Sequence, residues 1–344
     1  MTKRVLVAMS GGVDSSVTAA LLLDEGYEVV GATMKLWGGA SDSGCCSIAD
    51  VDDARRVAQQ LGIKHHVFNF GEEFMASVVG PYVNAHAVGN TPNPCIECNR
   101  HIKFDVFLER ALDLGFDAIA TGHHARIENR DGRFALLRGA DPAKDQSYVL
   151  HMMKQDALAR TLLPVGHMNK SQVREIAAER GLRTASKPDS QDVCFITSKG
   201  GRSAFLGDRI PMKPARLIDH ETGDDLGTLP SVEMVTVGQR KGMGGNTAER
   251  RYATEVDVAT GVVKVGNIAD LMTSRVDVTE MSFTNEVVLG GATVVAQVSA
   301  HGLPLGATFN GDHIIFDEPQ RRVARGQSVV VYSGDEVLGG GIVA

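Results

Sequence analysis

The feature that most limits how this chain can fold is a strand–loop–helix unit near its start. Residues Val5–Gly26 read VLVAMSGGVDSSVTAALLLDEG, and the apolar run leads through the loop Ser10–Ser16 into a helical pattern. Backbone N–H groups of a glycine-bearing loop before a helix bind phosphate. No lysine follows the glycines as in G-x-x-x-x-G-K-[ST], so we expect the loop to hold pyrophosphate as a leaving group, with Asp14 helping to hold Mg²⁺. An ordinary β–α turn is the alternative.

Strand and helix patterns alternate through the first half of the chain. This alternation predicts an α/β fold with a parallel, Rossmann-like sheet covered by helices on both faces, and ligands bind such sheets at the carboxyl ends of the strands. The expected strands are Arg4–Met9, Tyr27–Leu36, Ile63–Phe70 and Asp117–Thr121, with a hairpin of Ala125–Ile127 and Phe134–Leu137. The expected helices are Asp14–Glu25, Ser47–Leu61, Glu72–Ala87, Asn99–Leu114, Asp145–Met153 and Ser171–Arg180.

Helical periodicity ends near residue 200. The stretch Ser198–Gly207 is expected to be a loop, and short β-rich runs between turn residues follow it, which is typical of two small barrels or one split barrel. The runs are Glu233–Val237, Thr254–Val258, Val262–Val265, Val294–Val298 and Ser328–Tyr332. We expect a catalytic domain of residues 1–202, a small β-rich central domain of residues 203–273 and a C-terminal β-barrel domain of residues 274–344, with a boundary within Met272–Asp277.

Composition narrows the class of protein. The chain has 344 residues, 43% of them hydrophobic, which is enough for two or three globular domains. It contains no apolar run of about 18 residues, so we expect no membrane span and a cytoplasmic location. Five cysteines are too few for a disulfide scaffold at this length and indicate metal binding or catalysis. The net charge of −7 gives no bulk support to nucleic-acid binding, which would need a local basic patch.

Three segments hold the cysteines. In NTPNPCIECNRHIKFD, Cys98 stands just ahead of an expected helix, a position that lowers the pKa of a thiol and favours a nucleophile. A zinc half-site formed with Cys95 and plain buried thiols are the alternatives, and the adjacent pair Cys45 and Cys46 is poorly spaced to complete a zinc site. Cys194 in SKPDSQDVCFI, taken alone, is typical of a packed small side chain, but beside Cys98 it becomes a candidate partner in a two-thiol relay.

Two further polar motifs are ambiguous on their own. In ATGHHARI, Gly122 ends a strand and lets a nucleotide approach the backbone, while His123 and His124 suit phosphate binding, acid–base work or a structural role. In DPAKDQSYVL, Lys144, Asp145 and Gln146 stand at an expected helix start, where a solvated cap is the simplest reading.

Together the motifs resemble one family, the bacterial tRNA-specific 2-thiouridylases of the N-type ATP pyrophosphatase superfamily. They are SGGVDSS, GCCS, TPNPCIECNRHIKFD, ATGHHARI, DQSYVL, KPDSQDVCFI and VGQRKGMG, in family order. The resemblance implies a pyrophosphatase domain followed by a β-rich central domain and a C-terminal β-barrel. It also implies an activity: ATP adenylates the 2-oxygen of the wobble uridine of tRNA, and a cysteine persulfide then supplies sulfur, giving 2-thiouridine, AMP and pyrophosphate.

The resemblance assigns roles to particular residues. Cys98 is implied as the nucleophile and Cys194 as the persulfide carrier. ATP binding is implied for Ala8, Met9, Ser10, Gly11, Gly12, Val13, Asp14, Ser15, Met34 and Gly122. Contact with tRNA or its target base is implied for Asn93, Pro94, Cys95, His123, Lys144, Asp145, Gln146 and Gln327. The implied cofactors are ATP and Mg²⁺, the implied partners are tRNA and a persulfide-donating protein, and the expected state is a monomer.

The chain departs from the family in two places. Cys95 stands where many members have aspartate, which leaves the proton donor open and suggests an iron–sulfur cluster on Cys95, Cys98 and Cys194 as a hypothesis. A basic-aromatic run of the terminal barrel is replaced by AQVSAHG. Two basic clusters are available for RNA, with solvated charged faces as the alternative: Arg240, Lys241, Arg250 and Arg251, and Arg321, Arg322 and Arg325.

Two other functions stay open from the sequence. The first is an N-type ligase acting on a small molecule, which would exchange pyrophosphate with ATP in the absence of RNA. The second is a metal-binding RNA-interaction module without catalysis, which would hold stoichiometric zinc and turn over no ATP.

Overall fold

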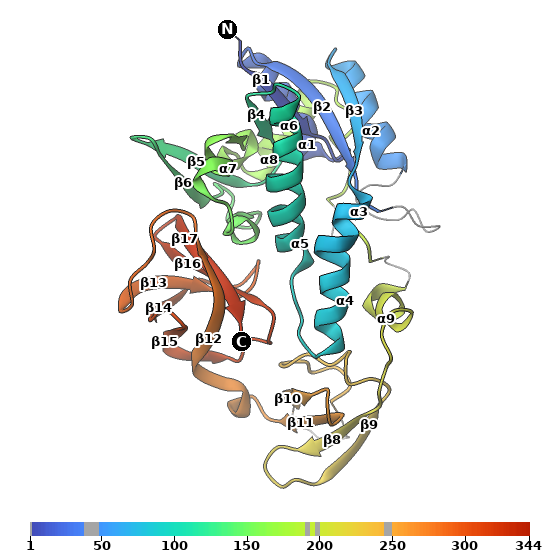
Figure 1. The fold of residues 1–344 in the computed structure, drawn as a ribbon, viewed down its shortest axis with the longest axis vertical. Coiled ribbons are helices and arrows are strands. Elements are labelled where there is room, and N and C mark those ends of the chain that lie inside the picture. The colour runs from blue at the N-terminus through green and yellow to red at the C-terminus, as the bar shows by residue number, and fades with distance from the viewer. Residues whose placement is uncertain (1, 38–47, 190–192, 197–199, 244–249) are drawn as a thin grey trace.

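The N-terminal half of the chain is built on a five-stranded parallel sheet (Figure 1). The computed structural model describes residues 2–37, 48–189, 193–196, 200–243 and 250–344. The sheet has the strand order β3-β2-β1-β4-β7, with every neighbouring pair parallel. Its strands are β1 (Arg4–Ala8), β2 (Glu28–Lys35), β3 (Lys64–Asn69), β4 (Ala118–Ala120) and β7 (Thr161–Leu162). The predicted α/β class and parallel sheet are confirmed.

Alternating side chains of β1 enter two separate cores. Val5 and Val7 pack with apolar residues of α1, α2 and α8, whereas Leu6 and Ala8 pack with those of the helical segments that follow β3. A strand buried on both faces is apolar throughout, as the run VLVA is. The helices on the first side are α1 (Val13–Asp24), α2 (Ile48–Gln60) and α8 (Lys170–Glu179).

Two long helical segments cover the second side, and both contain a π-helical stretch. The first consists of α3 (Gly71–Phe74), a π-helix (Met75–Val79) and α4 (Gly80–Ala87). The second consists of α5 (Pro94–Glu97), a π-helix (Cys98–Val106) and α6 (Phe107–Asp113). This second segment begins at Pro94, earlier than predicted, because the side chain of Asn93 accepts a hydrogen bond from the N–H of Cys95 and caps it. Cys98 therefore lies one turn inside the helix and not ahead of it.

Three local predictions are wrong. Asp145–Met153 forms only a short 3₁₀ turn (Ser147–Leu150), because the Asp145 carboxylate accepts from the N–H groups of Gly139 and Ser147 and competes with helix formation. The expected loop before Gly207 contains α9 (Gly201–Gly207), which buries Phe205 and Leu206. Glu233–Val237 forms turns and not a strand, since the Glu233 carboxylate accepts from Ser231 and from the N–H of Lys213. Further short elements are α7 (Gln155–Ala159) and 3₁₀ turns at Pro164–His167 and Ala269–Leu271.

The C-terminal part of the described chain contains one open sheet and one closed barrel. The predicted β-rich region and C-terminal β-barrel are confirmed, whereas the expectation of two small barrels or one split barrel is wrong. The sheet has the order β10-β11-β8-β9, from β8 (Ala215–Asp219), β9 (Asp225–Leu229), β10 (Tyr252–Asp257) and β11 (Val262–Gly266). The barrel has six antiparallel strands: β12 (Met272–Phe283), β13 (Ala292–Gln297), β14 (Leu305–Phe309), β15 (His313–Arg321), β16 (Ser328–Ser333) and β17 (Glu336–Val343). Pairing of β12 with β17 closes it. The exact boundaries at residues 202 and 273 stay a prediction.

A hairpin of the N-terminal half joins the barrel. The hairpin β5 (Ala125–Arg130) and β6 (Arg133–Arg138), predicted from the sequence, pairs with β17 where Leu137 lies opposite Glu336. The Glu336 carboxylate also contacts Arg130 and Arg133 at 2.7 and 2.5 Å. The barrel is therefore attached to the sheet domain by backbone pairing as well as by side chains. Among the helices of the described ranges, none is long and apolar enough to cross a membrane.

Candidate active site

The glycine-bearing loop lies between β1 and α1 at the carboxyl edge of the sheet, as predicted (Figure 1). Gly11 has φ +72° and packs so closely against Asp50 that a Cβ would overlap that residue's carbonyl oxygen. Gly12 caps α1 without a side-chain hydrogen bond, and the Ser15 hydroxyl accepts from the N–H of Ser10. Ala8, Met9 and Val13 are buried around the loop. The loop is therefore shaped before any ligand enters.

Gly122 lies so close to this loop that a residue with a Cβ would not fit in its place. A Cβ at Gly122 would lie 2.7 Å from the backbone nitrogen of Ser15 and 2.9 Å from the Cβ of Asp14. The sequence suggested that Gly122 makes room for a nucleotide, whereas here it makes room for the start of α1. Gly122 thereby fixes where the loop N–H groups stand.

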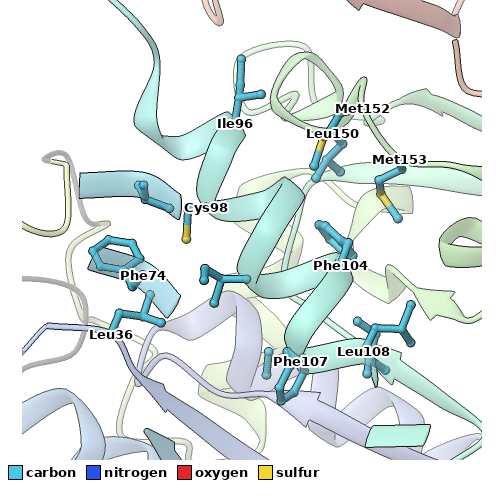
Figure 2. Close-up of a cluster of buried hydrophobic side chains, with 14 of the residues drawn as sticks. Leu36, Phe74, Ile96, Cys98, Phe104, Phe107, Leu108, Leu150, Met152 and Met153 are labelled. Atoms are coloured by element: carbon cyan, nitrogen blue, oxygen red, sulfur yellow. The ribbon is translucent and has the colours of Figure 1, made fainter. Parts of the chain in front are cut away.

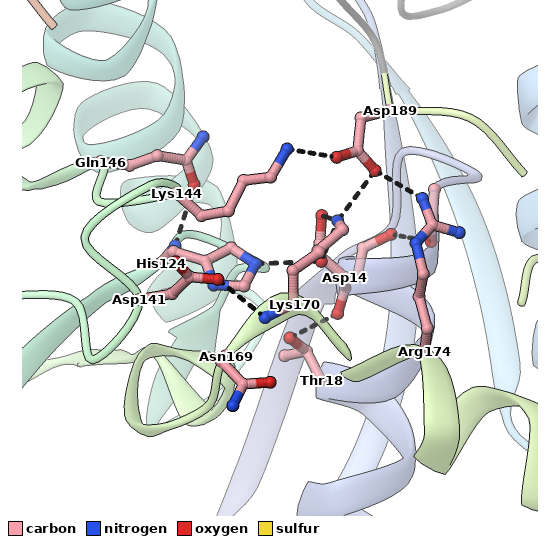
Figure 3. Close-up of polar contacts among 12 residues, drawn as sticks. Asp14, Thr18, His124, Asp141, Lys144, Gln146, Asn169, Lys170, Arg174 and Asp189 are labelled. Atoms are coloured by element: carbon pink, nitrogen blue, oxygen red, sulfur yellow. Dashed lines mark hydrogen bonds and ion pairs between the residues drawn. The ribbon is translucent and has the colours of Figure 1, made fainter. Parts of the chain in front are cut away.

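Asp14 is held by two basic side chains from distant segments (Figure 3). Lys170 Nζ lies 2.7 Å from both carboxylate oxygens, and His124 Nε2 lies 3.1 Å from Oδ1. Burial raises the pKa of Asp14, but the hydrogen bonds from His124 and Lys170 outweigh it, so that the pKa lies below the ordinary value. Asp14 is thus ionised and engaged, and Mg²⁺ would have to share or displace these partners.

Asp189 joins three cations at the same edge (Figure 3). Its carboxylate lies 2.8 Å from Lys144 Nζ, 2.9 Å from Lys170 Nζ and 2.9 Å from Arg174 Nη2. Burial raises the pKa of Asp189, yet the bonds from Lys144 and Lys170 lower it to about 2. The sequence did not single out Lys170 or Arg174, because both stand in an ordinary helix pattern that carries no motif.

Lys187 ties the loop to α2. Its Nζ contacts the carbonyl oxygen of Gly11 at 3.0 Å and the carboxylates of Asp50 and Asp53 at 2.7 and 2.8 Å. An ammonium has three N–H donors, so these contacts use all of them. Lys187 therefore holds the loop backbone on the side that faces α2.

His123 is buried and neutral. Burial lowers its pKa well below 6.5, and the neighbouring charge of Lys103 acts in the same direction. Lys103 Nζ lies 3.4 Å from Nε2 and can only donate, so Nε2 accepts and Nδ1–H donates to Thr121 Oγ1 at 2.7 Å. In this arrangement His123 has no proton to release from Nε2, and it presents an acceptor toward Lys103.

The DQSYVL motif connects the loop region to the barrel. Gln146 accepts from the N–H of His124 and donates its own N–H to the carbonyl of the same residue, both at 2.9 Å. The Asp145 carboxylate receives Arg138 Nη1 at 3.0 Å and the Ser147 hydroxyl at 2.9 Å. The side chain of Asp145 is 8% exposed, so it makes these contacts in the interior of the protein. Of the three residues, Gln146 is exposed, and the side chain of Lys144 is 37% exposed.

The thiols lie in different environments. Cys98 is buried in the large apolar cluster beside Phe74 and Leu36 (Figure 2), while Cys95 is exposed and Cys194 is half-buried. Phe195, the neighbour of Cys194, packs edge-on against Phe74 with ring centroids 5.7 Å apart. The Cys194 segment thus reaches the cluster that contains Cys98, as the relay requires. Cys45, Cys46, Ser190, Gln191 and Asp192 lie outside the described residues.

The thiol trio does not fit a metal cluster in this arrangement. No three His, Cys, Asp or Glu side chains are grouped to hold a metal ion in the described ranges. A cluster would need the exposed Cys95 and the buried Cys98 to face one ion.

A cavity of about 790 Å³ opens at the carboxyl ends of β2 and β3. It begins one residue after Met34, the position expected near adenosine, and Trp37 and Asn69 contribute an aromatic face and an amide. The lining residues are Lys35, Leu36, Trp37, Asn69, Gly71, Glu72, Met75 and Ala76. Its place at the sheet edge matches that predicted for a ligand.

The remaining predicted residues lie between the sheet domain and the barrel. Gln327 donates through Nε2 to the carbonyl oxygen of Thr91, and the N–H of Thr91 donates to the carbonyl of Arg325 at 2.8 Å. Asn93 and Pro94 follow directly as cap and first residue of α5. Gln327 therefore contacts the segment that leads to Cys95 and Cys98.

Comparison with known proteins shows the family to which the chain belongs. A family model described as "tRNA methyl transferase HUP domain" matches residues 3–198, and one described as "Aminomethyltransferase beta-barrel domain" matches residues 298–343. The tRNA-specific 2-thiouridylase MnmA of Carboxydothermus hydrogenoformans is 43% identical, over 99% of this chain and 97% of its own. The chain belongs to the tRNA-specific 2-thiouridylase family. The MnmA protein of Desulforamulus reducens, another member, is 44% identical with the same coverage.

The family membership confirms the resemblance drawn from the motifs. Among solved structures, a 4-thiouridine synthetase–RNA complex with bound ATP has a TM-score of 0.38 at 16% identity and covers 61% of this chain and 46% of that chain. That likeness is too low to support a conclusion about ligands.

Proposed function

We propose that this protein is a tRNA uridine 2-sulfurtransferase that adenylates the C2 oxygen of the wobble uridine and replaces it with sulfur. Full-length identity above 40% to 2-thiouridylases supports the activity. The observation that carries the chemistry is the placement of a preshaped phosphate loop and a Cys98–Phe74–Phe195 cluster on one sheet domain. Adenylation and sulfur transfer need these two parts in one catalytic domain.

The loop Ser10–Ser16 binds the β- and γ-phosphates of ATP, and the adenosine lies toward Met34 and the cavity beyond it. The first-turn N–H groups of α1 and the positive end of that helix stabilise the charge that develops on pyrophosphate as it leaves. Mg²⁺ bound together with ATP would reduce the negative charge of the phosphates. Asp14 is the loop's carboxylate and the candidate ligand of that ion, in exchange with its present partners.

Sulfur transfer uses the two thiols in sequence. Cys194 accepts a terminal sulfur from a persulfide donor protein, and this sulfur bonds to uridine C2 as AMP leaves. Cys98 then attacks the Cys194 sulfur, which breaks the remaining S–S bond, closes a Cys98–Cys194 disulfide and leaves the sulfur on C2. A thiol reductant must reopen that disulfide before the next turnover. The half-buried Cys194 suits exchange with an outside donor, and the buried Cys98 suits a resolving thiol.

RNA binding relies on local charge. The two basic clusters flank β10, since Arg321 lies 6.0 Å from the ring of Tyr252 and Arg322 Nη1 lies 3.4 Å from the carbonyl of Thr254. Gln239, next to Arg240, pairs through its backbone with Ala253 in the same strand. We place the tRNA along this face and past Asn93, Pro94 and Cys95, with steep salt dependence. We also propose a cytoplasmic monomer.

The test is reconstitution with purified protein, unmodified tRNA, Mg–ATP, a persulfide donor and a thiol reductant. We expect one pyrophosphate and one AMP released for each 2-thiouridine formed, with neither product in the absence of tRNA. Cys98→Ser and Cys194→Ser should release pyrophosphate and form no thiouridine, whereas Cys95→Ser should retain thiolation. Pyrophosphate release that needs no RNA would instead favour a small-molecule ligase. Iron and sulfide at stoichiometric amounts in anaerobically purified protein would contradict the two-thiol route.

A further inference from the structure

The disulfide that ends the proposed sulfur transfer would lie where a reductant reaches it poorly. Cys98 is 7% exposed and packs in the apolar cluster that contains Leu36 and Phe74 (Figure 2). Cys194 is half-buried, and its neighbour Phe195 packs against the same Phe74. Exchange with an outside thiol requires access to one of the two sulfurs. The reductant therefore meets a largely covered Cys98–Cys194 bond.

Cys95 supplies an exposed thiol close to this covered pair. It is the second residue of α5 and precedes Cys98 by three positions in the continuous helical segment of residues 94–113. Side chains three positions apart on a helix lie on one face, with Cβ atoms about 5–6 Å apart. Cys95 and Cys98 thus form a C-x-x-C pair with one exposed and one buried member, a spacing typical of redox-active dithiols.

The start of α5 allows the two thiols to meet. A disulfide needs Cβ atoms about 3.5–4.5 Å apart, so the turn has to tighten by roughly 1–2 Å. This turn is the first of the segment and bonds only to Asn93: the N–H of Cys95 donates to its side chain at 3.0 Å, and the N–H of Ile96 donates to its carbonyl oxygen at 3.2 Å. No preceding helical turn therefore resists the tightening.

We propose that Cys95 and Cys98 form a redox-active dithiol that carries the disulfide from the covered active site to the surface. The inference rests on the proposed sulfur transfer and adds a function to it, because the chain reopens its own Cys98–Cys194 bond before any outside reductant acts. It also gives a role to the cysteine that stands where many family members have aspartate. The outside reductant is a dithiol that acts on the exposed pair.

The exchange balances in atoms and electrons. The Cys95 thiolate attacks Sγ of Cys98, so that a Cys95–Cys98 bond forms and the Cys98–Cys194 bond breaks with Cys194 leaving as a thiolate. Cys95 releases one proton to water before the attack and Cys194 takes one up afterwards. The dithiol reductant then gives two electrons and two protons to the Cys95–Cys98 bond and itself becomes a disulfide. All three thiols are restored for the next turnover.

This relay requires less of the geometry than a metal cluster does. A cluster needs three thiolates around one ion at the same time, whereas exchange needs two sulfurs at a time. Cys98 is the shared member of both pairs. Cys194 packs against the apolar cluster that contains Cys98, and Cys95 lies one turn before Cys98 on the same helical segment.

A single turnover without reductant tests the transfer of the disulfide. The full-length protein is loaded with one persulfide sulfur, freed of small thiols, mixed with tRNA and Mg–ATP, quenched with N-ethylmaleimide and mapped by mass spectrometry. In the wild-type protein we expect a Cys95–Cys98 disulfide and an alkylated Cys194. In Cys95→Ser we expect the disulfide to stay at Cys98–Cys194. A wild-type protein that keeps mainly the Cys98–Cys194 disulfide would overturn the relay.

Repeated turnover measures what the relay contributes. The readout is the rate of later turnovers divided by that of the first, with a dithiol protein as the reductant. Cys95→Ser and Cys95→Asp should each lower this ratio by about tenfold or more, and a high concentration of a small dithiol should restore it. The matched control is Glu97→Gln, which removes no thiol but disturbs the same turn, where Glu97 lies 3.3 Å from Arg100 and from His101. Its ratio should stay within about twofold of wild type.

The ratio distinguishes the relay from a contact with RNA. Loss of a tRNA contact at Cys95 slows the first and the later turnovers alike, so an unchanged ratio in Cys95→Ser and Cys95→Asp would overturn the relay. An equal fall in Glu97→Gln would also overturn it, because the turn and not the thiol would then be responsible. A wild-type protein that forms no 2-thiouridine even in the first turnover would refute the proposed function, and the relay with it. A normal first turnover separates these two failures.

Discussion

Gln146 and His124 exchange two hydrogen bonds, one from each backbone N–H, and both are 2.9 Å long. The pair links the DQSYVL motif to the histidine that holds Asp14. A residue expected to contact RNA therefore also supports the glycine-bearing loop through His124 and Asp14. Replacement of Gln146 should affect stability and ATP binding even when no RNA is present.

We expect Gln146→Ala to lower the free energy of unfolding by about 1–3 kcal/mol, because the N–H of the buried His124 loses its acceptor. The affinity for ATP should fall with it, since His124 contacts Asp14. Urea denaturation and nucleotide titration measure both quantities. Gln60→Ala removes an exposed hydrogen bond to Gly181 and should cost less than about 0.5 kcal/mol. Equal effects of the two variants would contradict the supporting role.

Gly122→Ala tests how tightly the loop is packed. The new Cβ would lie 2.7 Å from the nitrogen of Ser15, so the start of α1 must shift and ATP affinity should fall at least tenfold. The control is Gly207→Ala in α9, where a Cβ meets nothing within 4 Å and the backbone is helical. Titration with ATP should leave Gly207→Ala at the wild-type affinity. Normal ATP binding by Gly122→Ala would refute the close packing.

Asp145 and Asp335 offer a matched comparison of buried and exposed ion pairs. Asp145→Asn leaves Arg138, which also stacks on Tyr332 at 3.6 Å, without its carboxylate, and should cost about 3–5 kcal/mol. Asp335→Asn breaks the pair with Arg126, in which the aspartate is 65% exposed, and should cost at most about 1 kcal/mol. Thermal unfolding distinguishes them. Similar losses would mean that Asp145 does not anchor the barrel.

Two histidines are buried in their neutral form, so we predict that the free energy of unfolding decreases in mild acid. Burial lowers the pKa of His86 to about 4 and that of His151 to about 3. Between about pH 4 and 6.5 the unfolded chain binds protons that the folded protein does not. The free energy of unfolding is therefore highest above about pH 6.5. Below that pH it decreases by about 1.4 kcal/mol per pH unit for each histidine.

Urea midpoints at pH 7.5 and 5.0 measure this dependence. His151→Gln should reduce the slope by about one proton, whereas His101→Gln, an exposed site paired with Glu97, should not reduce it by that amount. A midpoint that does not change with pH in the wild-type protein would contradict burial of neutral histidines.

Local patterns predicted the sheet domain well. The alternation of apolar runs with 3.6-residue periodicity identified β1, α1, β2 and β3 to within two residues, because each element depends on neighbours in sequence. The prediction failed where a side chain competes with the backbone, as Asp145 does in the expected helix. The sequence also placed the glycine-bearing loop between β1 and α1, where the structure has it, and phosphate binding by this loop stays a prediction.

The sequence did not predict the long-range contacts. Lys170 stands 156 residues from Asp14, and the docking of Arg138 on Tyr332 joins the sheet domain to the barrel. Such pairs follow from how helices and barrel pack, and no local spacing encodes them. The contacts that hold the loop in place were therefore found only in the structure.

The most direct test of the central claim is the 2-thiouridine content of tRNA from cells that lack this protein. The cells are complemented with wild type, Cys98→Ser or Cys194→Ser, and nucleosides are measured by mass spectrometry. We predict that 2-thiouridine disappears on deletion and returns only with the wild-type protein. Unchanged 2-thiouridine after deletion, in cells with no second enzyme of this kind, would contradict the account.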